Sequence, residues 1–278
     1  MIISVASGKG GTGKTTVATN LALSLKNVQF FDCDVEEPDS NIFINAEISD
    51  SKEVNVMIPE IDKEKCNFCG KCSEFCRYNA LAVVKSNALV FPELCHSCGG
   101  CELVCPTKAI RFNHRSIGKI EYGKKDGIEF YQGILNIGEI QAIPVLKELK
   151  KYIDKEKNVI LDAPPGTACP FVETVEGTDY CILVTEPTPF GLNDLKLAVD
   201  TARLIGVPFG VIINREGIGD NSVELYLQKE KIPILLKIPQ STEIAKLYSD
   251  GIAFVKKIPE WRIEFKKIFS IITKEVLK

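Results

Sequence analysis

The sequence lacks a long apolar run. Its 278 residues contain no stretch of about 18 consecutive apolar residues, the length that a transmembrane helix needs. A signal peptide is also missing, because the strand-like run MIISVAS begins at the first residue and leaves nothing to be cleaved. These two absences predict a cytoplasmic protein that does not span a membrane.

An excess of charge of one sign is missing as well. The chain has 34 Lys and Arg against 37 Asp and Glu, which gives a formal net charge of −3. Such a balance provides no overall electrostatic attraction to nucleic acid or to acidic lipid. We therefore expect no nucleic-acid partner.

Cysteine is abundant in one segment and scarce elsewhere. Eight of the 11 cysteines lie between Cys66 and Cys105, and none follows Cys181. In a reducing cytoplasm such clustering favours metal binding over disulfide bonds. Of the other three, Cys33 and Cys181 are expected to pack as small apolar residues, and the role of Cys169 stays open.

The rest of the chain alternates between strand-like and helical stretches. Apolar runs such as VQFFDCD, YCILVTEP and FGVIINR are separated by segments with helical spacing, such as LNDLKLAVDTARLIG. This alternation predicts an α/β fold with a mostly parallel sheet that helices cover on both faces. We expect this α/β domain in two parts, residues 1–60 and 114–278, interrupted by a small cysteine-rich α+β insert at residues 61–113.

The last 20 residues read as an amphipathic helix. Its apolar face would carry Trp261, Phe265, Ile268, Ile272 and Val276. We expect that face to dock onto the sheet; a membrane-targeting tail is the alternative.

Residues 8–15, GKGGTGKT, match the phosphate-loop pattern G-x-x-x-x-G-K-[ST] between a strand and a helix. Glycines let successive backbone N–H groups converge on phosphate oxygens, and the helix N-terminus adds the positive end of its dipole. Lys14 is expected to bind the β- and γ-phosphates, Thr15 to coordinate Mg²⁺ and Thr16 to hold the α-phosphate. The nucleotide-binding residues expected here are Gly8, Gly10, Gly11, Thr12, Gly13, Lys14, Thr15 and Thr16.

A second lysine, Lys9, stands near the start of the loop, and the variant KGGTGKT resembles the deviant phosphate loop of the MinD/ParA/Mrp family of ATPases, which includes the nitrogenase iron protein. The resemblance implies a P-loop NTPase fold and an ATP-dependent homodimer in which Lys9 reaches the nucleotide of the second copy. There it would stabilise the transferring phosphoryl group, as an arginine finger does. Hydrolysis would then be slow without a partner. A solvated loop lysine is the alternative.

Nearly all of residues 1–58 and 113–278 resembles this family, and the match implies roles for two acidic segments. In DCDVEEPD, Asp34 would orient or deprotonate the attacking water, and Asp39 would reach Mg²⁺ through a bound water. In DAPPGT, Asp162 would act on Mg²⁺ from its outer coordination sphere. The implied catalytic residues are Lys9, Lys14 and Asp34.

Three further positions follow from the same resemblance. The amide of Gly166 would turn toward the γ-phosphate, and Asn214, next to Arg215, would recognise adenine. The segment TEPT at residues 185–188 also looks like a family segment, but no chemistry is assigned to it.

The cysteine-rich segment repeats one spacing, C-x-x-C-x-x-C-x-x-x-C, at residues 66–76 and 95–105. This arrangement resembles a bacterial two-cluster ferredoxin, in which each 4Fe-4S cluster takes its fourth ligand from the other half. Zinc is the alternative, since CxxC pairs bind it readily, but eight cysteines in this doubled order favour two clusters. The implied ligands are Cys66, Cys69, Cys72 and Cys105 for cluster 1, and Cys95, Cys98, Cys101 and Cys76 for cluster 2.

Together these features indicate an ATPase that uses ATP and Mg²⁺ and couples its nucleotide state to electron transfer through two 4Fe-4S clusters toward a partner metalloprotein. The alternative is an iron–sulfur or metallocofactor assembly or carrier ATPase, in which ATP controls handover of the clusters. Complete sets of ligands favour stably bound clusters. Mrp-type carriers use a CxxC pair in their C-terminal part, which this chain lacks. A positioning ATPase is a third possibility, suggested only by the C-terminal helix.

Overall fold

One sheet of nine strands organises the chain in the computed structural model, which describes residues 1–277. The strands are β1 (Ile2–Ala6), β2 (Val28–Asp32), β3 (Glu47–Ile61), β6 (Ile110–Lys125), β7 (Ile128–Leu135), β8 (Asn158–Asp162), β9 (Tyr180–Thr185), β10 (Phe209–Glu216) and β11 (Ile234–Pro239). Their order is β11-β10-β9-β1-β8-β2-β7-β6-β3. Neighbours from β11 to β7 are parallel, and β6 and β3 complete one edge as antiparallel strands.

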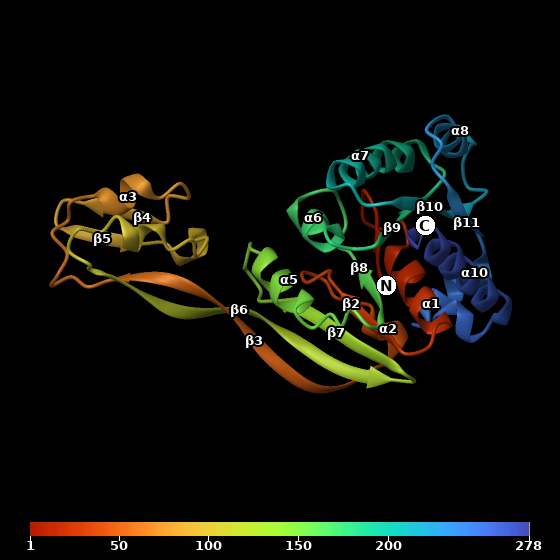
Figure 1. Cartoon of the computed structure of the whole chain (residues 1–278), viewed down its shortest axis with the longest axis horizontal. Helices are drawn as coiled ribbons and strands as arrows, with labels where there is room; N and C mark the ends of the chain where they lie inside the picture. Colours follow the sequence, from red (N-terminus) through yellow and green to blue (C-terminus); the bar gives the residue numbers. More distant parts are fainter. Residues whose placement is uncertain (278) are drawn as a thin grey trace.

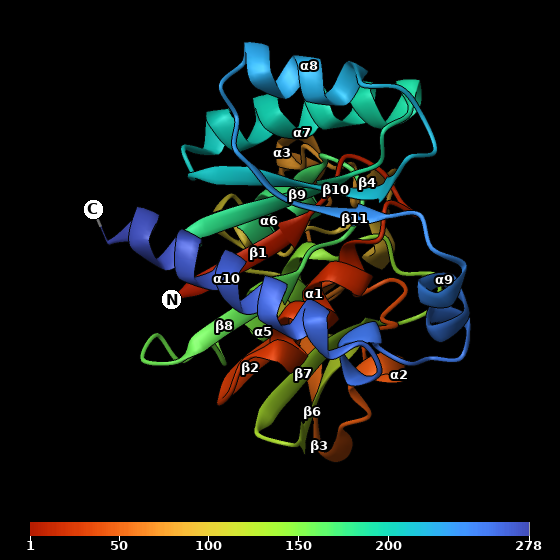
Figure 2. The ribbon, with the colours of Figure 1, turned by 90° about the vertical axis from the view of Figure 1, so that its right-hand side faces the viewer.

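Helices cover both faces of the sheet (Figure 2). They are α1 (Lys14–Ser24), α2 (Asn41–Ile44), α5 (Ile143–Lys150), α6 (Cys169–Val175), α7 (Pro189–Ile205), α8 (Ser222–Lys229), α9 (Thr242–Ser249) and α10 (Pro259–Val276). The buried residues of α1 and α10 share a core with one face, and those of α5, α6, α7 and α8 pack on the other. The predicted α/β fold with a mostly parallel sheet covered on both faces is therefore confirmed.

The central strands are buried along their whole length. All five residues of β1 and all six of β9 are buried. Because helices pack on both sides, these strands are mostly apolar and do not alternate between apolar and polar residues. Cys181, in β9, and Cys33, just after β2, have no exposed surface, as expected of small core residues. Since the strands are parallel, the loops that follow them meet at one edge of the sheet.

A long antiparallel ribbon of β3 and β6 projects from the sheet (Figure 1). The two strands have 15 and 16 residues and pair from Glu47 with Lys124 to Ile61 with Ile110. The sequence does not predict this ribbon, because residues 47–53 are all exposed and carry no buried apolar side chain. The ribbon joins the sheet to the cysteine-rich segment.

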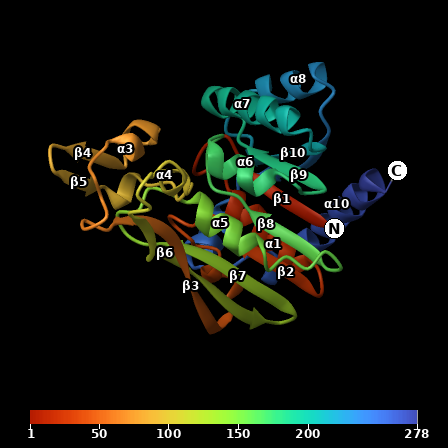
Figure 3. The ribbon, with the colours of Figure 1, turned by 60° about the vertical axis from the view of Figure 1, so that its left-hand side comes forward.

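The far end of the ribbon carries the cysteine-rich segment (Figures 1 and 3). It contains α3 (Lys71–Phe75), β4 (Leu81–Val84), β5 (Asn87–Val90), the 3₁₀ turn η1 (Pro92–Leu94) and α4 (Gly100–Leu103). Its small core is built around Leu81, Cys101 and Ile110. Such a core buries little apolar surface. The boundaries at residues 61 and 113 stay a prediction.

The C-terminal helix α10 docks onto the face that α1 also covers, as expected. Phe265, Ile268 and Ile272 are buried in the core there. Trp261 packs edge-on against Phe254, with the ring centroids 5.6 Å apart. Among residues 1–277, no helix combines the length and the apolar content needed to cross a bilayer.

Phe265→Ala should lower the free energy of unfolding by about 3–5 kcal/mol, because it empties a buried site between α10 and the sheet. Urea-induced unfolding followed by circular dichroism measures the loss. Ile263→Ala is the matched control in the same helix, since Ile263 is 57% exposed; it should change stability by less than about 1 kcal/mol. Equal losses in the two variants would contradict the docked helix.

Candidate functional site

A glycine-rich turn joins β1 to α1. Gly11 and Gly13 have φ angles of 78° and 94°, in the left-handed region that glycine adopts without strain. A Cβ atom at Gly13 would overlap the side-chain amide nitrogen of Asn214. That nitrogen donates a hydrogen bond to the carbonyl oxygen of Thr12 at 2.8 Å. Asn214, predicted to recognise adenine, thus also holds the turn in place.

The turn borders a pocket of about 430 Å³ at the carboxyl edge of the sheet. Predicted site residues that line it are Gly10, Gly11, Gly13, Lys14, Thr15, Thr16, Asp34, Asp39, Asn214 and Arg215. The opposite wall comes from residues 239–241 and from α9, with Ile244 and Tyr248, none of which the sequence analysis named. Their signal was their position after β11, another parallel strand that ends at this edge.

Five predicted residues lie outside this lining: Gly8, Lys9, Thr12, Asp162 and Gly166. Gly8 packs so closely on the backbone of Asp194 in α7 that a Cβ atom would overlap it. Gly166 donates its N–H to the carbonyl oxygen of Ser7 at 3.2 Å. Thr12 has a buried hydroxyl without a hydrogen-bond partner among the described residues. Asp162 and Lys9 are described next.

Asp162 ends β8 beside Asp32, its register partner at the end of β2. Ser40 bridges the two carboxylates, with its N–H 2.9 Å from Asp32 Oδ2 and its hydroxyl 3.0 Å from Asp162 Oδ2. Asp162 Oδ1 is buried and has no hydrogen-bond partner within residues 1–277. Thr15 lies within hydrogen-bonding reach of the same carboxylate. A free carboxylate oxygen beside a hydroxyl suits a hard cation, so these residues fit Mg²⁺.

Burial disfavours the charged forms of these acids. It raises the pKa of Asp162 and of Asp34 to about 6, although Lys14 opposes the shift in both. Burial and the charge of Asp162 raise the pKa of Asp32 well above its ordinary value. A divalent cation bound here would relieve the repulsion and keep the carboxylates ionised.

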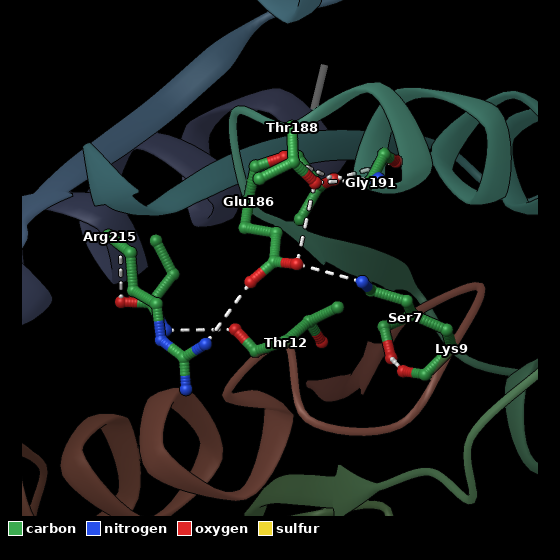
Figure 4. A network of polar contacts seen from close by, with 9 residues as sticks. Ser7, Lys9, Thr12, Glu186, Thr188, Gly191 and Arg215 are labelled. Carbon is green, nitrogen blue, oxygen red and sulfur yellow. Dashed lines mark hydrogen bonds and ion pairs between the residues drawn. The ribbon is translucent and has the colours of Figure 1, made fainter. Parts of the chain in front are cut away.

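Lys9 pairs with Glu186 of its own chain (Figure 4). The Lys9 Nζ atom is 2.7 Å from Glu186 Oε1, and Arg215 Nη1 is 3.2 Å from Oε2. Sequence analysis assigned no chemistry to residues 185–188 and so missed Glu186. The one signal was an acidic side chain directly after an apolar strand. The reach of Lys9 to a second copy stays a prediction.

The eight clustered cysteines surround two small cavities at the far end of the ribbon. The first is lined by Cys66, Cys69, Cys72 and Cys105, and the second by Cys76, Cys95, Cys98 and Cys101. Each cavity draws three thiols from one half of the repeat and one from the other, which is the grouping predicted for the ligands. Among residues 1–277, no three His, Cys, Asp or Glu side chains come close enough together to hold a single metal ion.

The two halves of the cysteine repeat have the same backbone features at matching positions. The N–H groups of Ala80 and Ala109 donate to the sulfurs of Cys76 and Cys105 at 3.3 and 3.2 Å. Positive φ angles occur at matching positions: Phe68 and Ser97, Gly70 and Gly99, Asn79 and Lys108. Amides that donate to sulfur stabilise thiolates and tune the potential of an iron–sulfur cluster.

The chemistry of the two linings suits an iron–sulfur cluster. In both cavities apolar side chains line the wall beside the thiols, such as Ile61 and Val83 in the first cavity and Phe112 in the second. Soft sulfur donors in an apolar wall are typical ligands of such clusters. Burial raises the pKa of Cys101 to about 11. That thiol is therefore protonated at neutral pH, and a metal that bound there would have to displace its proton.

Comparison with known proteins extends these observations. A family model of the CobQ/CobB/MinD/ParA nucleotide binding domain matches residues 3–254. An uncharacterized protein of Methanocaldococcus jannaschii is 33% identical over 263 residues, which cover 92% of each chain. The iron-sulfur cluster carrier protein of Pyrococcus horikoshii is 25% identical over 272 residues, which cover 91% of this chain and 78% of that relative.

Solved structures share the fold. The cell division ATPase MinD of Pyrococcus furiosus has a TM-score of 0.61 at 18% identity, with 98% of each chain covered. The septum site-determining protein MinD of Pyrococcus horikoshii, complexed with Mg-ADP, has a TM-score of 0.60 at 20% identity, with 96% of this chain and 93% of that chain covered. At such identities the likeness shows the fold alone.

The ratio kcat/KM for ATP hydrolysis should fall about tenfold per pH unit below pH 6, because this ratio reports the ionisation of the free protein. There the pKa of Asp34, the predicted general base, is about 6, and a protonated carboxyl cannot accept a proton from water. Asp34→Asn should remove most of the rate together with this limb of the pH profile. Glu53→Gln, which neutralises an exposed glutamate on the ribbon, is the control and should keep both. If the limb persists in Asp34→Asn, it belongs to another group, such as Asp162.

Proposed function

The chain belongs to the CobQ/CobB/MinD/ParA nucleotide-binding domain family, and from this premise we propose that it is an ATPase that couples its nucleotide state to electron transfer through two 4Fe-4S clusters. The acceptor would be a partner metalloprotein. One observation carries the proposal: two cavities, each ringed by four thiols in the three-plus-one order of a two-cluster ferredoxin. The nucleotide pocket and these cavities belong to the same chain, so ATP and electrons can be linked within one molecule.

ATP would bind with its phosphates on the glycine-rich turn, where backbone N–H groups and the buried side chain of Lys14 neutralise them. Thr15 and Asp39 would hold Mg²⁺ from the pocket wall. Asp162 would act on Mg²⁺ from its outer coordination sphere through Oδ1, which has no hydrogen-bond partner within residues 1–277. Asn214 and Arg215 line the side of the pocket left for the base.

Two residues would act on the reaction itself. Asp34, about half-buried in the pocket wall, would orient the attacking water and accept its proton. Lys9 would reach the γ-phosphate of a second copy and stabilise the charge that develops there. Hydrolysis therefore needs an ATP-dependent homodimer and is slow without it.

When bound, the clusters supply one-electron transfer; the chain supplies their ligands and surroundings. Apolar side chains, including Phe75 and Tyr78, line the second cavity and limit the access of water, which affects the potential. Cys69 and Cys98 are exposed, one at each cavity. A redox partner would therefore approach the insert from the side of these two ligands.

A continuous set of contacts supports coupling between the nucleotide pocket and the second cavity. Val35, next to Asp34, accepts a hydrogen bond from the N–H of Leu135 at 2.8 Å. Leu135 ends β7 and leads into a loop in which Gln141 Nε2 donates to the carbonyl oxygen of Cys95 at 2.9 Å. Val35 and Cys95 also belong to one apolar core. A shift of the loop that holds Asp34 would thus displace Cys95, an expected ligand of cluster 2.

An iron–sulfur carrier is the second candidate, favoured by the likeness to the iron-sulfur cluster carrier protein of Pyrococcus horikoshii. In that case ATP would control release of the clusters instead of electron flow. Transfer of clusters to an apo-ferredoxin separates the two: loss of iron from this protein, matched by gain in the acceptor and dependent on ATP, supports the carrier. Clusters that are reduced and reoxidised without leaving support electron transfer.

Reconstituted protein should contain about eight iron atoms per chain, as two 4Fe-4S clusters require. Cys105→Ser should lose one cluster and give the same electron paramagnetic resonance spectrum as Cys66→Ser, because the two thiols line one cavity. Cys98→Ser should lose the other cluster, because Cys98 lines the second cavity, and its spectrum should differ from that of Cys105→Ser. Cys169→Ser, which removes an exposed thiol outside both cavities, is the control. If Cys105→Ser matched Cys98→Ser instead, the crossed arrangement would be wrong.

Nucleotide should shift the potential of cluster 2 more than that of cluster 1, because Gln141 contacts Cys95. An anaerobic redox titration with ADP and with a non-hydrolysable ATP analogue measures the difference. Gln141→Ala should reduce it, whereas Asn113→Ala, which removes a hydrogen bond to exposed Glu60 on the ribbon, should not. Identical titrations with both nucleotides would count against coupling.

A further inference from the structure

Glu186 lies between two cations from different segments (Figure 4). It follows β9, whereas Lys9 follows β1 and Arg215 lies within β10. Lys9 Nζ is 2.7 Å from one carboxylate oxygen and Arg215 Nη1 is 3.2 Å from the other. The side chain of Glu186 is only 11% exposed, compared with 31% for Lys9 and 48% for Arg215. The anion is therefore the most sheltered member of the trio.

The backbone around Glu186 is tightly fixed. Thr188 donates its N–H to the Glu186 carbonyl oxygen at 2.8 Å, and its hydroxyl is 3.4 Å from Glu186 Oε1. A Cβ atom at Gly191 would overlap the Glu186 carbonyl oxygen, and one at Gly219 would overlap that of Pro187. The backbone of Glu186 therefore has no room to follow Lys9 when Lys9 moves.

Arg215 makes release of Lys9 possible. A sheltered carboxylate that loses its sole cation is strongly disfavoured, because the desolvated charge has nothing to compensate it. Here Arg215 pairs with the second oxygen, so it can still neutralise the carboxylate after Lys9 leaves. Arg215 lines the nucleotide pocket, whereas Lys9 does not. The ion pair can therefore open at Lys9 while the carboxylate stays neutralised.

We propose that Glu186 is a positioning residue for Lys9: it holds the Lys9 ammonium within its own chain until the nucleotide phosphates of a second copy compete for it. Pairing with Glu186 thus lowers the fraction of molecules whose Lys9 is free to enter the dimer. The proposal rests on the proposed function for the identity of the competing ligand. The retention of Lys9 by Glu186 can be measured without any nucleotide.

The first test is the reactivity of Lys9 in the nucleotide-free protein. Mass spectrometry after brief treatment with an amine-acetylating reagent gives the rate of modification at Lys9. Glu186→Gln keeps the shape and removes the charge, and should raise that rate several-fold. Glu176→Gln, which neutralises an exposed glutamate on another surface, is the charge-matched control and should leave it unchanged. An unchanged rate in Glu186→Gln would overturn the proposal. Thermal unfolding of both variants checks that they are folded.

The second test is ATP-dependent dimerisation, measured by sedimentation with a non-hydrolysable ATP analogue. Release of a partly exposed ion pair should lower the dimer dissociation constant of Glu186→Gln by about two- to fivefold. In a Lys9→Ala background the same substitution should have no further effect. An effect that persists without Lys9, or a weaker dimer in Glu186→Gln, would contradict the proposal. Faster acetylation without any nucleotide-dependent dimer would leave the retention of Lys9 standing and refute the proposed homodimer.

Discussion

The hydrogen-bonded ladder between β3 and β6 fixes the position of the cysteine-rich segment relative to the nucleotide pocket. It begins on the sheet, at Glu47 and Lys124, and ends at Ile61 and Ile110, where the cysteine-rich segment starts. Because side chains alternate along a strand, a slip of one residue would turn the apolar residues of the ribbon away from the core that contains Val54, Val56 and Ile58. The pairing therefore keeps Cys95 near the loop after β7, where Gln141 contacts its carbonyl oxygen.

The nucleotide pocket depends on close approaches between segments that are distant in sequence. The turn before α1 is held by Asn214 after β10 and packs on α7 through Gly8. Its acidic wall brings Asp32 and Asp162 together at the ends of neighbouring strands. Packing of apolar strands thus stabilises an arrangement of charges that would be unfavourable by itself, and a bound cation would compensate it.

Local sequence patterns were sufficient for part of this arrangement. The glycine-rich turn was predictable because its residue spacing reflects local geometry. The crossed grouping of thiols followed instead from the resemblance to a two-cluster ferredoxin, and as a set of cluster ligands it stays a prediction. The ribbon was not, since residues 47–53 face solvent and pair with residues beyond 118. Glu186 was missed for a similar reason, because its partners Lys9 and Arg215 are distant in sequence. A pattern in the sequence does not show which residues from different strands form an ion pair.

The position of the ribbon at the edge of the sheet makes the insert a removable module. Ile61 and Ile110 face each other as the last pair of an antiparallel ladder, so a short turn of two residues could join them directly. Removing residues 62–109 would leave the seven parallel strands with all their neighbours. Evolution could therefore add or lose the eight-cysteine segment by changing a hairpin loop, without rebuilding the domain that binds nucleotide.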